Sequence, residues 1–220
     1  MAAVAGRAPS CPGLRSDPAP GYDVAPMEPQ IFLLTGFPGT GKYTVARALV
    51  EQLRLGGDTA LLVDNHWINN PIFGLIESDG ISPLLPEVWE RVAEVRDAVF
   101  RTLEELTPRA WHVVTTAYLD GQTDLGYVER LAALSAARGS TFVPVRLQCE
   151  VDENVRRISL PERRERMKAV DPELPVRLAL KGPPFVSGHA NELSLDITAR
   201  TPLEAARAVL AHAGTISPRG

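Results

Sequence analysis

A glycine-rich segment with one lysine is the part of this 220-residue sequence that points most directly to chemistry. It matches the pattern G-x-x-x-x-G-K. Glycines let the backbone curl so that several N–H groups face one anion, and a lysine adds a mobile cation for the β- and γ-phosphates of a nucleotide. We expect ATP contacts along the whole segment, called the phosphate loop below: Gly36, Phe37, Pro38, Gly39, Thr40, Gly41, Lys42, Tyr43 and Thr44. Lys42 is also a candidate catalytic residue.

The position after the lysine departs from the common pattern. Tyr43 stands where Ser or Thr is usual, and Thr44 follows it. Thr44 is therefore the candidate hydroxyl ligand of Mg²⁺. The alternative is a glycine-rich turn between a strand and a helix that binds no ligand.

A dense polar cluster follows the second predicted strand, Ala60–Val63. Ligands of open parallel sheets bind at the carboxyl ends of the strands, so Asp64 is a candidate general base for an acceptor hydroxyl, or an orienter of Mg²⁺ through water. Candidate substrate contacts are Asn65, His66 and Asn69. Alternatively, Asp64 and Asn65 cap a turn.

The third predicted strand, 111–118, ends without an acid. Thr115 and Thr116 lie where a metal-orienting carboxylate is common, and the next acid is Asp120. We expect Mg²⁺ to be held by Thr44, phosphates and water, helped by Asp64 or Asp120.

Basic residues gather between 156 and 168. Guanidinium groups neutralise the charge that spreads over a phosphoryl group in transfer. The leading catalytic candidates are Arg157 and Arg164, with Arg163 next as a substrate contact. The alternative is a solvated helix face, because glutamates are interleaved.

Buried strands alternating with helices predict a three-layer α/β fold with a five-stranded parallel sheet. The remaining strands are 31–34, 142–147, with a bulge at Pro144, and 193–197. Helices are expected from about 42, over 88–106, from 127 to near 139, over 152–180 with a break at Pro161, and from 201, where Thr201 and Glu204 form a capping box. The stretch 65–86 reads as irregular.

Residues 1–28 read as a disordered leader, which leaves one domain over 29–215. The formal net charge of −4 disfavours a nucleic-acid partner, and the absence of a long apolar run disfavours a membrane span. Two cysteines in such a chain suit the reducing cytoplasm. A monomer or a homodimer is expected.

The chain resembles the small P-loop kinases, such as adenylate kinase, shikimate kinase and chloramphenicol phosphotransferase, in its loop and helix GFPGTGKYTVARAL. It also resembles bacterial AAA-domain ATP-binding proteins in the segment VDNHWINNP and in an R-x-x-R stretch before DPEL. The resemblance implies strand order 2-3-1-4-5, phosphoryl transfer from Mg·ATP, and a lid over about 156–172 that brings arginines over the phosphates. It also implies an adenine contact near His189.

These features together predict an ATP-dependent kinase that phosphorylates a small hydroxylated or nucleotide-like metabolite. The alternative is a nucleotide-binding regulatory ATPase without a small-molecule acceptor, which the missing acid after the third strand makes credible.

Overall fold

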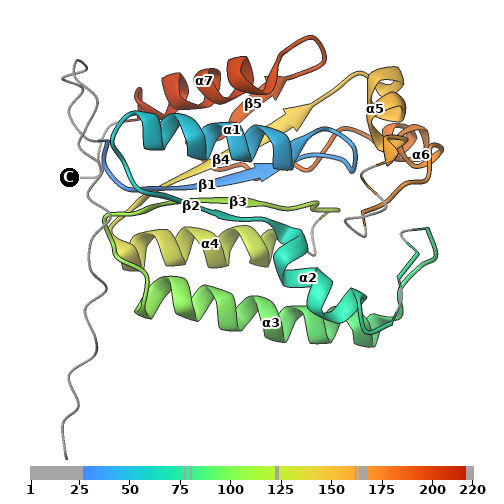
Figure 1. Ribbon diagram of the computed structural model, residues 1–220, viewed down its shortest axis with the longest axis horizontal. Coiled ribbons are helices and arrows are strands. Elements are labelled where there is room, and N and C mark those ends of the chain that lie inside the picture. The colour runs from blue at the N-terminus through green and yellow to red at the C-terminus, as the bar shows by residue number, and fades with distance from the viewer. Residues whose placement is uncertain are drawn as a thin grey trace, which may run out of the picture.

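The computed structural model describes residues 27–76, 78–79, 81–121, 124–161, 163 and 168–216. In these residues five strands form one parallel sheet with helices on both faces (Figure 1). The strands are β1 (Gln30–Thr35), β2 (Ala60–Val63), β3 (His112–Thr116), β4 (Thr141–Gln148) and β5 (Leu193–Asp196). Their order is β2-β3-β1-β4-β5, which confirms the predicted three-layer fold and strand order. Residues 1–26 of the predicted leader lie outside the described residues.

The two faces of the sheet are covered by different helices. Helices α1 (Lys42–Leu55) and α7 (Pro202–Ala213) lie on one face, and α3 (Pro86–Glu105) and α4 (Leu125–Arg138) lie on the other (Figure 1). Phe32 and Leu34 of β1 pack on the α1 and α7 side, whereas Ile31 and Leu33 pack on the opposite side. Because successive side chains of a strand point to opposite faces, β1 is buried along its whole length and its carboxyl end is rigidly placed.

Three short helices complete the fold: α2 (Asn65–Phe73), α5 (Val151–Ile158) and α6 (Leu174–Lys181). Helices α5 and α6 lie beyond the end to which β1 and β4 point (Figure 1). The predicted capping box of α7 is confirmed, since the Thr201 side chain accepts from Glu204 N and the Glu204 side chain accepts from Thr201 N.

The prediction that the stretch 65–86 is irregular is wrong for its first half. Helix α2 forms there, although it contains Pro71. Tertiary packing outweighs the low helix propensity of this sequence. Ile68 and Phe73 are buried against the core, and the Phe73 ring meets Trp89 of α3 edge-on, with ring centroids 5.7 Å apart. This helix carries several of the candidate substrate contacts.

Two further expectations are corrected. In place of the predicted helical region 152–180, α5 ends at Ile158 and α6 begins only at Leu174, and the described residues 168–173 before α6 are not helical. Pro144 sits in regular register opposite Leu33, without a bulge. The carbonyls of Phe142 and Gln148 both face the β5 side, so the nitrogen of Pro144 faces it too, and β5 pairs with β4 only from Val145 onward. The missing donor therefore removes no ladder bond.

Candidate functional site

The phosphate loop joins β1 to α1 at the carboxyl end of the sheet. Gly36, Gly39 and Gly41 have φ values of 142°, 95° and 95°, a region that L-residues avoid. A Cβ on Gly36 would lie 2.5 Å from the carbonyl oxygen of Leu147, and one on Gly39 would lie 2.1 Å from Oδ1 of Asn154. The loop is therefore packed so closely on β4 and α5 that two of its glycines have no room for a side chain.

The Lys42 side chain folds back over this loop. Its Nζ donates to the carbonyl oxygens of Gly36 at 2.8 Å and Phe37 at 2.9 Å. Burial, together with the positive charges of Arg163 and Lys168, lowers the pKa of Lys42 to about 7, against the opposing effect of Asp64. A triphosphate in the loop would relieve this repulsion, because it brings negative charge to a place where three cations gather.

The other loop side chains differ in their surroundings. Thr40 is buried, and its Oγ1 donates to Phe37 O at 2.9 Å, so this side chain braces the loop. Tyr43 is half-buried, and the Arg47 guanidinium lies 5.9 Å from its ring centroid. Thr44 is exposed in the first turn of α1, and its role as a metal ligand stays a prediction.

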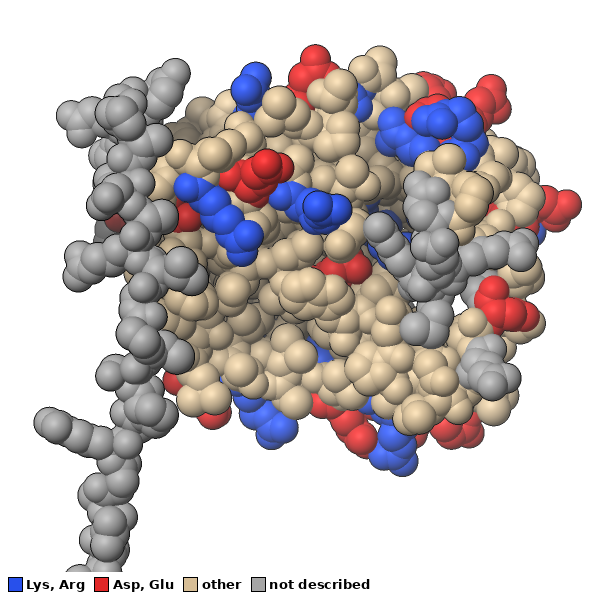
Figure 2. Space-filling view, viewed as in Figure 1, with Lys and Arg blue, Asp and Glu red and all other residues tan. Residues whose placement is uncertain are grey.

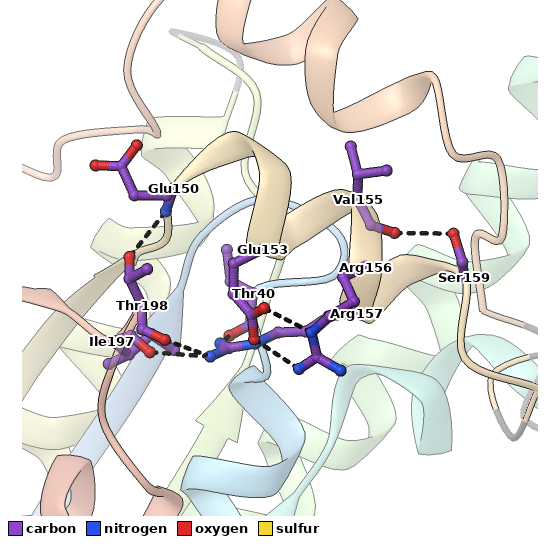
Figure 3. A network of polar contacts seen from close by, with 9 residues as sticks. All are labelled: Thr40, Glu150, Glu153, Val155, Arg156, Arg157, Ser159, Ile197 and Thr198. Carbon is purple, nitrogen blue, oxygen red and sulfur yellow. Dashed lines mark hydrogen bonds and ion pairs between the residues drawn. The ribbon is translucent and has the colours of Figure 1, made fainter.

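Arg157 of α5 is tied to the back of the phosphate loop (Figure 3). Its Nη1 donates to Thr40 O at 3.0 Å, and its Nη2 donates to the carbonyl oxygens of Ile197 and Thr198 at 3.0 and 3.1 Å. Its Nε donates to Glu153 at 2.7 Å. These bonds join the loop, α5 and the segment after β5, so Arg157 positions the loop in this arrangement. The phosphate contact predicted for it is untested.

Asp64 follows β2 directly and is 3% exposed. It stands at the N-cap position of α2 but makes no side-chain capping bond, which contradicts the alternative of a simple cap. Its Oδ1 instead accepts from Thr116 Oγ1 at 2.5 Å, and the same hydroxyl accepts from Asn65 N at 3.1 Å. Thr116 of β3 thus orients the Asp64 carboxylate, a role that the sequence did not reveal.

Lys168 is a second residue whose place at the site was missed. Its Nζ lies 3.9 Å from Oδ2 of Asp64 and 4.5 Å from the ring centroid of Tyr43. Arg163 lies in the same segment, where its Nε donates to Ala169 O at 3.0 Å. The sequence signal was only a run of basic residues, and nothing in it singled out Lys168. Arg164 and the neighbouring Arg166 lie outside the described residues.

The candidate substrate contacts of α2 lie close to this cluster. Burial lowers the pKa of His66 to about 4, aided by the charge of Lys168, so His66 is neutral at pH 7. Its Nδ1 lies 3.3 Å from Oδ1 of Asn70. Asn69 is 4% exposed, and its Oδ1 has no hydrogen-bond partner in the part of the chain that is described. The neutral His66 ring therefore lies near enough to Asp64 to feel the charge of its carboxylate.

His189 is not near the phosphate loop, which corrects the expectation of an adenine contact. Its ring packs edge-on against Phe142, with centroids 5.2 Å apart, and Phe142 pairs with Ile31 near the start of β1. The phosphate loop follows the opposite end of β1. A position shortly before β5 is at the amino end of a parallel sheet, whereas the ligand end comes after the strand.

No group of three or more His, Cys, Asp or Glu is placed to hold a metal ion among the described residues. Mg²⁺ that arrives with a nucleotide needs only one or two protein ligands, because phosphates and water supply the rest. The lone Asp64 carboxylate and the Thr116 hydroxyl fit such an ion as outer partners. Asp120 is exposed in the loop after β3.

Among the described residues, two neighbouring cavities share Phe37 and residues 182–184 in their walls. One of about 440 Å³ is bordered by polar groups that include Gln148, Asn154 and Asp196. The other, of about 380 Å³, is bordered by the charged groups of Asp120 and Lys181, and both cavities have more apolar than polar wall. The face of the molecule in Figure 2 carries acidic and basic side chains interspersed, without a continuous basic stripe. Within the described ranges, no helix is both long and apolar enough to cross a bilayer.

Solved structures of kinases resemble this chain, whereas no protein-family model and no curated protein matches it. A putative kinase from Chloroflexus aurantiacus has a TM-score of 0.61 and 22% identity, over 87% of this chain and 100% of that one. A gluconokinase from Sinorhizobium meliloti has a TM-score of 0.54 and 17% identity, over 84% and 92%. The APS kinase CysC of Mycobacterium tuberculosis, solved with AMPPNP and APS, has a TM-score of 0.53 and 17% identity, over 86% and 100%. The protein has the fold of the P-loop kinases.

Proposed function

We propose that this protein is an ATP-dependent phosphotransferase that acts on a small hydroxylated molecule. The observation that supports it most is the meeting of two groups at one end of the sheet. Lys42 lies on the phosphate loop after β1, and the buried Asp64 carboxylate after β2 is near enough for its charge to raise the Lys42 pKa. A cation for the phosphates and a base for the acceptor are the two groups that this reaction requires.

The loop and the cations bind and orient the triphosphate in this proposal. Backbone N–H groups of the curled loop face the phosphate oxygens, and the N-terminus of α1 adds partial positive charge. Lys42 exchanges the carbonyls of Gly36 and Phe37 for phosphate oxygens, and Arg163 and Lys168 contribute further positive charge. Mg²⁺ supplies charge neutralisation at the β- and γ-phosphates when bound.

Asp64 accepts the proton of the acceptor hydroxyl. Its Oδ1 is held by Thr116, which leaves Oδ2, near Lys168, to face the incoming hydroxyl. The acceptor oxygen forms a bond to the γ-phosphorus while the bond from this phosphorus to the bridging oxygen of ADP breaks. Neutral His66 and Asn69 supply hydrogen bonds to the acceptor without adding charge beside the carboxylate.

Acceptor-stimulated ADP formation tests the proposal. Purified protein is supplied with Mg·ATP and a panel of alcohols, sugars, sugar acids and nucleosides, beside the Lys42→Ala variant and the control variant Arg101→Ala on the exposed side of α3. The proposal predicts that at least one acceptor raises ADP formation in the wild type and in Arg101→Ala, and not in Lys42→Ala.

A second function is favoured by one observation, the threonines Thr115 and Thr116 in place of an acid at the end of β3. A nucleotide-binding regulator with slow hydrolysis would bind ATP and release ADP at a rate that no acceptor changes. That outcome would replace the kinase proposal.

A further inference from the structure

The smaller cavity beside Phe37 has no role in the phosphate chemistry described above. It has a volume of about 380 Å³, within the range of roughly 300–1,000 Å³ common for small-molecule sites. It lies at the carboxyl end of the sheet, between the phosphate loop, the segment after β3 and the chain that leaves α6. Its lining residues are Phe37, Leu119, Asp120, Gly121, Leu125, Leu178 and Lys181, with residues 182–186.

The walls of this cavity are mostly apolar. Leu119 and Leu178 are each 5% exposed, so they form a fixed floor, and Phe185 packs against the core at one side. Val186 is 51% exposed at the rim. Binding of a hydrocarbon group against such a wall is favourable because it removes apolar surface from water. The same wall offers few hydrogen-bond partners to a sugar rich in hydroxyl groups.

Two charged groups border the apolar walls, Asp120 and Lys181, and no ion pair joins them in the described part of the chain. The Tyr118 hydroxyl lies beside Asp120. Burial, with the charge of Asp120 and a hydrogen bond to it, raises the pKa of Tyr118 above its ordinary value, so the phenol stays protonated. The cavity therefore offers a carboxylate acceptor and a lysine cation at the border of its apolar walls.

Phe37 connects this cavity to the phosphate loop. Its carbonyl oxygen accepts from Lys42 Nζ at 2.9 Å and from Thr40 Oγ1 at 2.9 Å, while its ring faces Tyr118 with centroids 6.5 Å apart. A molecule that packs on the Phe37 ring is therefore next to the residue that holds the phosphate-binding lysine. An acceptor whose body packs on this ring has the phosphate loop as its direct neighbour, which is the proximity that a transfer reaction needs.

We propose that the cavity at Phe37, Leu119 and Asp120 binds the acceptor of the reaction, and that this acceptor is an aromatic or branched aliphatic alcohol. The inference rests on the proposed function and narrows its substrate class. The apolar body lies against Phe37, Leu119 and Leu178, beside the Asp120 carboxylate. The transferred phosphoryl group goes to its hydroxyl oxygen, whose proton passes to Asp64, and ADP leaves.

Ligand-observed NMR with 2-phenylethanol and 3-methylbutanol as probes tests the cavity without any turnover. The variant Val186→Asp places a charge at the rim, and Leu180→Asp is its control, since Leu180 is 84% exposed on α6 and does not line the cavity. We expect binding by the wild type and by Leu180→Asp, with affinity at least about tenfold weaker in Val186→Asp. Thermal unfolding of both variants checks that they fold.

Absence of probe binding by the wild type, or equal binding by Val186→Asp, overturns the inference. Acceptor-stimulated ADP formation by sugars or nucleosides and by no apolar alcohol also overturns it, while the phosphotransferase proposal stands. ATP binding without stimulation by any acceptor refutes the phosphotransferase proposal and removes the acceptor role from the cavity with it.

Discussion

Lys168 Nζ lies 3.9 Å from Oδ2 of Asp64, across the site from the Thr116 hydroxyl that holds the other carboxylate oxygen. The Lys168 charge also lowers the pKa of Lys42 and that of His66. One side chain from the segment after α5 thus influences the candidate base, the phosphate-binding lysine and a candidate substrate contact.

Replacement of Lys168 by Met is expected to raise the pKa of His66 from about 4 toward its ordinary value, because one repulsive charge is removed while burial still opposes protonation. Proton NMR titration of the ring measures it, with a His66→Gln variant to assign the signal. Lys181→Met is the control, since this lysine has no part in the His66 shift. An unchanged titration in Lys168→Met would contradict the arrangement.

Stability of the ligand-free protein should depend on pH through Lys42. The folded pKa is about 7 and the ordinary value is 10.5, so between these limits the unfolded chain holds a proton that the folded chain lacks. The free energy of unfolding therefore rises as pH increases through this range. Lys42→Met should be more stable than the wild type at pH 6.5, and the difference should narrow by pH 9.5. Urea unfolding at both pH values measures this, and parallel stabilities would contradict the lowered pKa.

Gly39→Ala tests the packing of the phosphate loop. The new Cβ meets Asn154 Oδ1 at 2.1 Å, and the backbone has φ 95°, so a loss of about 1–3 kcal/mol in the free energy of unfolding is expected together with weaker ATP binding. Addition of Asn154→Ala removes the side-chain clash but leaves the unfavourable φ, so the double variant should recover part of the loss. Complete recovery would show that the positive φ carries no strain.

Arg157→Lys tests whether this arginine positions the loop. A lysine cannot replace the bonds of one guanidinium to Thr40, Ile197 and Thr198, so the unfolding free energy should fall by about 1–3 kcal/mol even without ATP. The adjacent Arg156 binds only Glu153 in the described structure, with its side chain 63% exposed. Arg156→Lys should leave stability unchanged. A loss of ATP affinity in Arg157→Lys without loss of stability would instead support the phosphate contact first predicted.

The sequence predicted the phosphate loop because glycines, a lysine and an apolar strand stand together in the chain. The strand order does not follow from a local pattern, and it was implied by the resemblance to P-loop kinases. The position of Asp64 at the ligand end followed from its place directly after β2. The phosphate loop and the position of Asp64 could be predicted without knowing which distant residues meet.

The missed parts depend on contacts between distant residues. Thr116 and Lys168 both contact Asp64 only in the folded chain. Helix α2 was not predicted because it contains Pro71, and its buried side chains stabilise it. The prediction of an adenine contact at His189 was wrong for another reason. A position close to β5 in the sequence can lie at either end of that strand, and His189 lies at the amino end. Arg157 was recognised as important, but the residue pattern could not distinguish a phosphate contact from a loop anchor.

Calorimetry of ATP binding with magnesium present tests the central claim, that the phosphate loop and Lys42 hold a nucleoside triphosphate. We predict saturable binding of ATP by the wild type and a loss of at least about tenfold in affinity in Lys42→Ala, equal to about 1.4 kcal/mol or more. Failure of the folded wild-type protein to bind either ATP or GTP would contradict the account.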